Sequence, residues 1–299
     1  MVEISRWGRD PKTIDKGFYR AAYKDVASFS DEEIEAHYFD AGISEGRIGH
    51  PKSVRENLSL CHSPNDHILE IGPFCYPVMA GPNVKYFDVL DRDALLSRAS
   101  EHNLDPDGVP DQIDYVSPTG DLSVVQETFD CVFSSHCLEH QPDLIAHLNS
   151  VESIIKPGGK YLMIIPDKRF CFDHYIAETT LADVLEAWLD KRKNHTIKSV
   201  VEHVALTTHN VASQHWRNAN DFTAYFDSIA SRAQKAIDLF QSSTGYIDVH
   251  AWQFTPISLR TLLELLKRMS LINFDSVICY ETPKDRLEFI VEITYSDAQ

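Results

Sequence analysis

The chain has 299 residues, of which 43% are hydrophobic, and it carries a formal net charge of −17 at pH 7. This length fits one large domain or one domain with additions, and the hydrophobic content is ample for a core. The acidic balance argues against a nucleic-acid-binding protein, because affinity for the phosphate backbone depends on Lys and Arg. No apolar run approaches the ~20 residues that are needed to span a membrane.

Residues 1–58 are predicted to form a helical segment ahead of the main domain. Ser30 and Glu33 have the spacing of a capping box, which indicates the start of a helix. Gly42 and Gly46 then favour the end of the helical stretch. One interpretation of this segment is a plain docking segment that covers one side of the core. The other rests on a resemblance of residues 23–47 that is given below.

The stretch 66–74 is predicted to be a short buried strand that ends near Glu70 and breaks at Gly72 and Pro73. A carboxylate at the carboxyl end of a buried strand is costly without a partner. In open parallel sheets, ligands bind at that end of the strands. Further strands are predicted at 83–89, 112–116, 128–135 and 160–165, with a helix from about 142 to 155 and a turn at 156–159.

Three segments of this region resemble the motifs of one family. LEIGPF (69–74), FDCVFSSHCLEH (129–140) and IIKPGGKYLMIIP (154–166) are similar to the first, fourth and fifth strand motifs of class I S-adenosylmethionine (SAM)-dependent methyltransferases, in a type 11-like branch. One departure is that only Gly72 remains of the usual glycine-rich loop. The resemblance implies an α/β fold with a Rossmann-like seven-stranded methyltransferase sheet, and residues 59–166 would be its SAM-binding core. SAM would be the cofactor and S-adenosylhomocysteine the product.

The resemblance also implies where the cofactor binds. Asp88 falls where the family places the acidic residue for the ribose hydroxyls, and one carboxylate offers two acceptor oxygens to two vicinal hydroxyls. Asp91 is the alternative for this role, but it is also a candidate helix cap. Asp121 falls where the family contacts the adenine, although many such residues only close turns. The predicted cofactor-binding residues are Glu70, Gly72, Pro73, Phe74, Asp88, Asp91, Gly120, Asp121, Ser134 and Ser135.

Residues 167–253 are predicted to be a helical insertion that covers the active site and selects the substrate. Leu181, Val184 and Leu185 have helical spacing, and a second helical stretch covers 222–240. So long a segment would be unusual as a loop. The core is predicted to resume over 254–299, with a helix that begins at Pro256 and two strands at 272–280 and 287–295, which form an antiparallel pair at the sheet edge.

Methyl transfer to a hydroxyl oxygen requires alignment of the reactants and removal of a proton. The base must lie beyond the fourth and fifth strands, where the candidates are His136, His140, Asp167 and His174. His136 and His140 are four residues apart, so on a helical turn they would share a face.

Three further residues are candidates for contact with the acceptor. Arg169 could clamp a carboxylate or phosphate with its planar guanidinium, and its alternative is an ion pair with Asp167 or Asp173. His250 and Trp252 precede the final helix and are expected to face the cleft. The alternative for Trp252 is core packing.

Three other functions compete with the methyltransferase interpretation. Residues 136–140 match H-x-x-E-H, the inverted zinc-peptidase pattern, but they lie at a strand-to-helix junction cut off by Pro142, so no metal is predicted. A dinucleotide-dependent oxidoreductase is disfavoured because the G-x-G-x-x-G turn is absent. A SAM-binding scaffold without catalysis stays open, since fold does not imply function.

Two shorter resemblances suggest the acceptor. Residues 23–47 resemble a YxDV … HYxxxGxxEGR segment found beside bacterial polysaccharide glycosyltransferases, and residues 166–173 resemble a PDKR-x-x-FD block in methyltransferases of surface-glycan gene clusters. They imply O-methylation of a sugar or polysaccharide precursor, and a small metabolite is the alternative acceptor. A homodimer and an association with glycan-synthesis enzymes stay open.

The cellular location is inferred from the cysteines and from the start of the chain. The six cysteines form no CxxC pair and lie largely in apolar surroundings, which is typical of buried free thiols in a reducing compartment. The first ten residues lack the apolar segment of a signal peptide. We therefore expect a cytoplasmic protein.

Overall fold

The computed structural model describes residues 9–296, and it contains a seven-stranded sheet in the order β3-β2-β1-β4-β5-β7-β6. The strands are β1 (Ile68–Ile71), β2 (Val84–Asp88), β3 (Tyr115–Val116), β4 (Phe129–Ser135), β5 (Ile155–Pro166), β6 (Ser276–Cys279) and β7 (Glu288–Thr294). Pairs among β1 to β5 are parallel, whereas β7 runs antiparallel to both β5 and β6. This confirms the predicted α/β fold, its methyltransferase-type sheet and the antiparallel pair at its edge.

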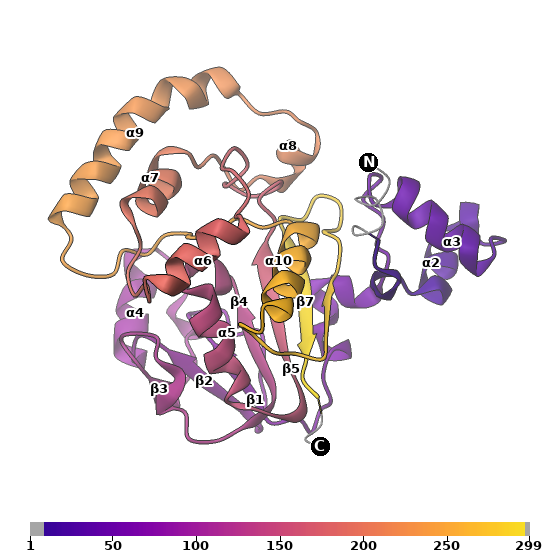
Figure 1. The fold of residues 1–299 in the computed structure, drawn as a ribbon, viewed down its shortest axis with the longest axis horizontal. Coiled ribbons are helices and arrows are strands. Elements are labelled where there is room, and N and C mark those ends of the chain that lie inside the picture. The colour runs from indigo at the N-terminus through magenta and orange to yellow at the C-terminus, as the bar shows by residue number, and fades with distance from the viewer. Residues whose placement is uncertain (1–8, 297–299) are drawn as a thin grey trace.

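The sheet is covered on both faces, which explains why all four residues of β1 are buried. One face packs against α5 (Leu144–Glu152), α6 (Leu181–Leu189) and α10 (Pro256–Arg268), which lie side by side in Figure 1. The other face is covered by Leu58 and Cys61 from the short 3₁₀ segment before β1 and by Met79 from the loop after it. A smaller apolar cluster joins α4 (Arg92–Glu101) to that loop.

Three boundaries predicted from the sequence were wrong. The third strand is shorter than 112–116. The predicted helix 142–155 begins only at Leu144, because Asp143 is its N-cap and accepts a hydrogen bond from the Ala146 N–H at 2.9 Å. Residues 156–159 are part of β5 and not a separate turn. There the register with β4 shifts, and the main chain of Gly158 and Gly159 bonds to residues 295 and 296.

The N-terminal segment has helices of its own, α2 (Lys16–Ala22) and α3 (Asp31–His37), and Figure 1 shows it projecting from the side of the sheet. The capping box is confirmed, since the Ser30 hydroxyl accepts from the Glu33 N–H and the Glu33 carboxylate accepts from the Ser30 N–H. A small apolar cluster holds the segment together; it consists of Ile14, Tyr19, Val26, Ile34 and Tyr38. The expectation about a signal peptide concerns residues 1–10, of which 1–8 lie outside the described residues.

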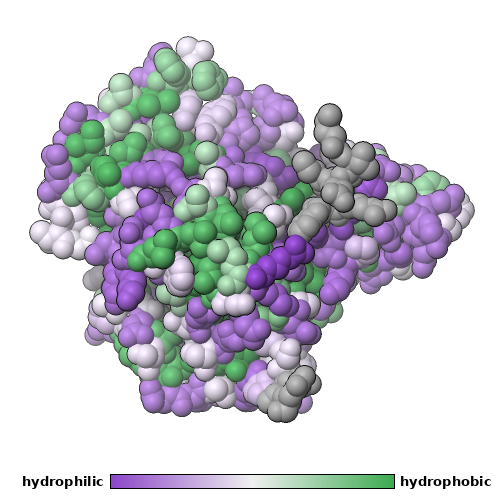
Figure 2. Space-filling model, viewed as in Figure 1, coloured by the Kyte–Doolittle hydropathy of each residue, from purple (hydrophilic) through white to green (hydrophobic). Residues whose placement is uncertain are grey.

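Beyond the carboxyl ends of β4 and β5 lies the predicted helical insertion (Figure 1). After α6 come α7 (Ile197–Ala205), α8 (Ala212–Trp216) and α9 (Phe222–Ser242), so both predicted helical stretches are confirmed. Only Ala236 of α9 is buried, and Phe222 and Phe226 are exposed on it; Figure 2 shows apolar residues among polar ones over this region. The domain boundaries at 58, 166 and 253 stay predictions, as does the covering role. Within residues 9–296, no helix is long and apolar enough to cross a membrane.

Candidate active site

The loop after β1 is held by Glu70, whose side chain is buried within the strand. Its carboxylate accepts hydrogen bonds from the Val78 N–H at 2.9 Å and the Met79 N–H at 2.7 Å. Burial raises the pKa of Glu70 to about 7, and these two bonds act in the opposite direction. A buried carboxylate needs a hydrogen-bond partner, and for Glu70 that partner is the main chain of the loop that follows it. Glu70 lies opposite Tyr86 in the register, so it is not level with Asp88.

Gly72 provides an open position at the start of this loop. Its φ of 71° lies in the left-handed region, and no atom lies within 4 Å of the place where a Cβ would be. Its N–H donates to the Phe87 carbonyl at 2.8 Å, which fixes the loop to the end of β2. Phe74, with a φ of 45°, is also left-handed. The main chain here is therefore shaped and uncovered in the way that close approach of a ligand requires.

The three acidic candidates near this loop differ in their surroundings. Asp88 is buried at the end of β2, where its Oδ1 accepts the Leu90 N–H at 3.0 Å; burial raises the pKa of Asp88. Asp91 is the N-cap of α4 and accepts the Ala94 N–H at 2.9 Å, as the alternative for this residue predicted. Asp121 likewise caps a 3₁₀ turn after Gly120 and accepts the Ser123 N–H at 2.9 Å.

The two predicted serines at the end of β4 already have partners in the protein. The Ser134 hydroxyl is buried and lies 2.8 Å from the Tyr161 hydroxyl. Ser135 Oγ accepts from the Arg55 guanidinium at 2.9 Å, and the same guanidinium pairs with Glu288. Both side chains therefore stabilise the end of the sheet.

Just beyond β4, the side chains of His136, His140 and His250 converge on Glu139. Glu139 is fully buried, and among the described residues neither of its carboxylate oxygens has a hydrogen-bond partner. Its Oε1 lies 3.6 Å from His136 Nδ1, 4.0 Å from His140 Nε2 and 3.9 Å from His250 Nε2. We call these four residues the Glu139 cluster. The three histidines of this cluster were predicted site residues. From the sequence, Glu139 belonged only to the zinc-peptidase pattern.

The main chain explains why residues so distant in sequence meet here. The Ala251 N–H donates to the Glu139 carbonyl at 2.7 Å, which brings the segment that follows α9 against the turn after β4. His250 Nδ1 then lies 2.7 Å from Asp173 Oδ2. Burial raises the pKa of Asp173 to about 7 and lowers the pKa of His250 to about 3. His136 and His140 do not lie on one α-helical turn, as was predicted, because the turn Leu138–His140 is a 3₁₀ helix and His136 precedes it.

The other predicted residues of this region contact one another. Asp167 is buried and accepts from the Arg169 guanidinium at 2.6 Å and from the Thr282 hydroxyl at 2.6 Å, so the ion-pair alternative for Arg169 is confirmed. His174 Nδ1 lies 2.6 Å from the Arg169 carbonyl. Trp252 is buried in the main core and donates from Nε1 to the Gln141 carbonyl at 2.6 Å, which confirms its core-packing alternative.

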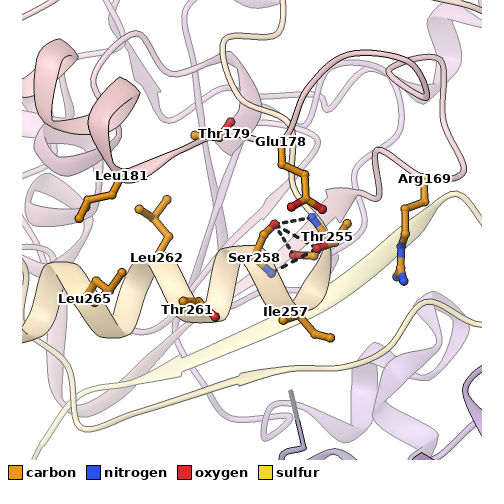
Figure 3. Close-up of a pocket in the computed structure, with 10 residues that line it drawn as sticks. All are labelled: Arg169, Glu178, Thr179, Leu181, Thr255, Ile257, Ser258, Thr261, Leu262 and Leu265. Carbon is orange, nitrogen blue, oxygen red and sulfur yellow. Dashed lines mark hydrogen bonds between the residues drawn. The ribbon is translucent and has the colours of Figure 1, made fainter. Parts of the chain in front are cut away.

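A separate open pocket of about 480 Å³ lies between α6 and α10, and Figure 3 shows Arg169 at one end of it. Thr255 and Ser258 line it, but their hydroxyls bond to each other at the start of α10. None of the residues that line this pocket belongs to the Glu139 cluster. Arg169 is therefore the one predicted site residue that lines this pocket, and the Glu139 cluster lies outside it.

Comparisons with known proteins identify the family. The family model described as "Methyltransferase domain" matches residues 78–227, half of the chain. No curated protein matches. Among solved structures, the DhpI–SAH complex is 14% identical, with 97% of this chain and 98% of that chain covered and a TM-score of 0.38.

Two further solved structures match this chain over about half of their own length. The CurJ carbon methyltransferase is 13% identical, with 81% of this chain and 52% of that chain covered and a TM-score of 0.37. The glycopeptide N-methyltransferase MtfA with SAM is 18% identical, with 39% and 55% covered and a TM-score of 0.29. This chain thus spans about half the length of these two proteins. With its family match and its seven-stranded sheet, the chain belongs to the methyltransferase-domain family and is a class I SAM-dependent methyltransferase, which uses SAM and forms S-adenosylhomocysteine.

Proposed function

We propose that this enzyme transfers the methyl group of SAM to an oxygen atom of a sugar or polysaccharide precursor in the cytoplasm. The observation that carries the choice of oxygen is the Glu139 cluster, in which three histidines and a buried carboxylate gather beyond β4. A hydroxyl acceptor loses a proton during transfer, and imidazole and carboxylate groups are suited to accept it. The choice of a sugar is supported by the two resemblances to proteins of glycan gene clusters.

The residues around the loop after β1 fit the cofactor. Gly72 leaves its main chain uncovered, and Asp88 has a buried carboxylate that accepts main-chain N–H groups, including that of Leu90, and would also accept the ribose hydroxyls. When bound, SAM supplies a methyl group that is already activated by the sulfonium. The protein then has to align the acceptor with that group and to take up its proton.

The side chains beyond β4 and β5 suit the second task. The side chains of His136 and His140 are 35% and 25% exposed, so the Glu139 cluster is open to an acceptor on one flank. On this proposal the helices of residues 167–253 hold the acceptor, and the N-terminal segment is the part available to glycan-synthesis enzymes.

Cofactor binding is tested by calorimetry with S-adenosylhomocysteine. We expect Asp88→Ala to weaken binding at least tenfold, because the ribose hydroxyls lose their acceptor. The matched control is Asp93→Ala, an exposed carboxylate on α4, which should leave the affinity unchanged. Equal affinity of the wild type and Asp88→Ala would contradict the ribose assignment.

The acceptor class is tested with radiolabelled SAM and three sets of acceptors: nucleotide sugars, oligosaccharides and small hydroxylated metabolites. We expect label in the sugars, at a position that periodate or mass spectrometry assigns to oxygen. Label only in small metabolites would support the alternative acceptor. Cofactor binding without transfer to any acceptor would support a scaffold.

A further inference from the structure

The Glu139 cluster contains a carboxylate that is too deeply buried to be left without a counter-charge. Glu139 is fully buried, and neither of its side-chain oxygens is hydrogen-bonded among the described residues. A buried carboxylate without partners costs several kcal/mol, and the distances of 3.6–4.0 Å to the three histidine nitrogens are too long for hydrogen bonds.

Each histidine of the cluster also has a carboxylate close to its second ring nitrogen. His136 Nε2 lies 2.7 Å from Glu288 and His250 Nδ1 lies 2.7 Å from Asp173, both within hydrogen bonds. His140 Nδ1 lies 2.9 Å from Asp248 as an ion pair but without hydrogen-bond geometry. In every case the other ring nitrogen is the one turned toward Glu139. Metal-binding histidines are oriented in this manner, since the carboxylate fixes the ring and increases the basicity of the ligating nitrogen.

We propose that Glu139, His140 and His250 bind a divalent transition-metal ion. One ligand atom from each of these three residues lies within 4.8 Å of the others. Two ligands of a tetrahedral ion, at bond lengths of about 2.1 Å, lie roughly 3.4 Å apart, so small side-chain movements complete the site. Imidazole ligands favour Zn²⁺, Co²⁺ or Ni²⁺ over Mg²⁺ and Ca²⁺, which take oxygen ligands.

No metal was predicted from the sequence, because residues 136–140 alone match only a truncated helical zinc motif. The structure builds the site differently, since one ligand comes from His250 and reaches Glu139 through the main-chain bond of Ala251. Three protein ligands with an open flank are typical of catalytic sites, in which the free position takes a substrate oxygen. If the proposed function holds, the ion would bind the acceptor hydroxyl and lower its pKa before methyl transfer.

Metal binding is tested without cofactor or acceptor, so its outcome is independent of the proposed function. The protein is stripped with a chelator, and Co²⁺ is added while visible absorption is recorded; Zn²⁺ is then added in competition. We expect one equivalent of Co²⁺ with micromolar affinity or tighter, and bands of a four- or five-coordinate ion that Zn²⁺ removes. Absence of stoichiometric binding by the wild type would overturn the site.

Variants locate the ion. His250→Gln and Glu139→Gln should each weaken Co²⁺ binding at least 100-fold, and Asp173→Asn, which keeps all ligands, about 10- to 100-fold. His215→Gln is the control, because this buried histidine bonds to the His209 carbonyl outside the cluster. Should the ligand variants not fold, Asp173→Asn alone decides. Binding that is equally tight in the control and in the folded variants would contradict the assignment.

Discussion

The carboxylate of Glu70 makes the stability of the fold depend on pH in a direction that can be tested. The pKa of this group rises on folding from its ordinary value of 4.5 to about 7, because burial disfavours the charged form. The folded state therefore holds a proton on Glu70 that the unfolded state releases between these values. Stability is fully retained below pH 4.5 and decreases as the pH rises toward 7.

The magnitude follows from this difference in proton affinity. Each tenfold change corresponds to about 1.4 kcal/mol, so ionising buried Glu70 costs about 3 kcal/mol well above pH 7, and about 2.5 kcal/mol of this arises between pH 5 and 8. Glu70→Gln cannot ionise. Its amide also loses one acceptor for the N–H groups of Val78 and Met79, which adds a loss that does not vary with pH.

Urea-induced unfolding of both proteins between pH 5 and 8 measures the effect. We expect the stability of the wild type, relative to Glu70→Gln, to fall by about 2 to 3 kcal/mol over this range. The matched control is Tyr86→Phe. It removes the hydrogen bond from the Tyr86 hydroxyl to the Met79 carbonyl in the same loop, and it adds or removes no charge over this range. A stability difference between the wild type and Glu70→Gln that stays constant from pH 5 to 8 would refute the reasoning.

Three further predictions concern packing and helix caps, and urea unfolding measures each. Leu263→Ala empties a fully buried site on α10 and should lower the free energy of unfolding by about 2–5 kcal/mol; its control, Ile257→Ala, changes a residue that is 45% exposed on the same helix and should cost less than about 0.5 kcal/mol. Asp91→Ala removes the cap of α4 and should cost about 1 kcal/mol with unchanged S-adenosylhomocysteine affinity, whereas weaker binding would reassign Asp91 to the ribose. Ser30→Ala should cost a similar ~1 kcal/mol, confined to the N-terminal segment, and an unchanged stability would show that the capping box contributes nothing.

Local signals in the sequence predicted where α3 and α10 begin. Thr255 and Pro256 supply the N-cap and the first-turn proline of α10, and Ser30 and Glu33 form the box that begins α3. The error at residues 156–159 has a tertiary cause. Proline and glycine indicate a turn locally, yet here the glycines continue β5, and their main chain bonds to residues 295 and 296 just beyond β7.

The site was predictable only in part, for a related reason. His136, His140 and His250 were candidates by residue type and position, and the structure brings all three to Glu139. Asp173 was considered only as a partner of Arg169, whereas it contacts His250. No local pattern could reveal this pairing, because it depends on where the chain returns after α9.

The hydrogen bond between the Ala251 N–H and the Glu139 carbonyl has a consequence for how such enzymes diversify. It involves no side chain, so only a substitution to proline removes its donor. The helices between residues 181 and 242 can therefore differ in length and sequence while the segment after α9 still packs against the turn after β4. A new acceptor would then require new helices only, and the reactive groups would be inherited intact.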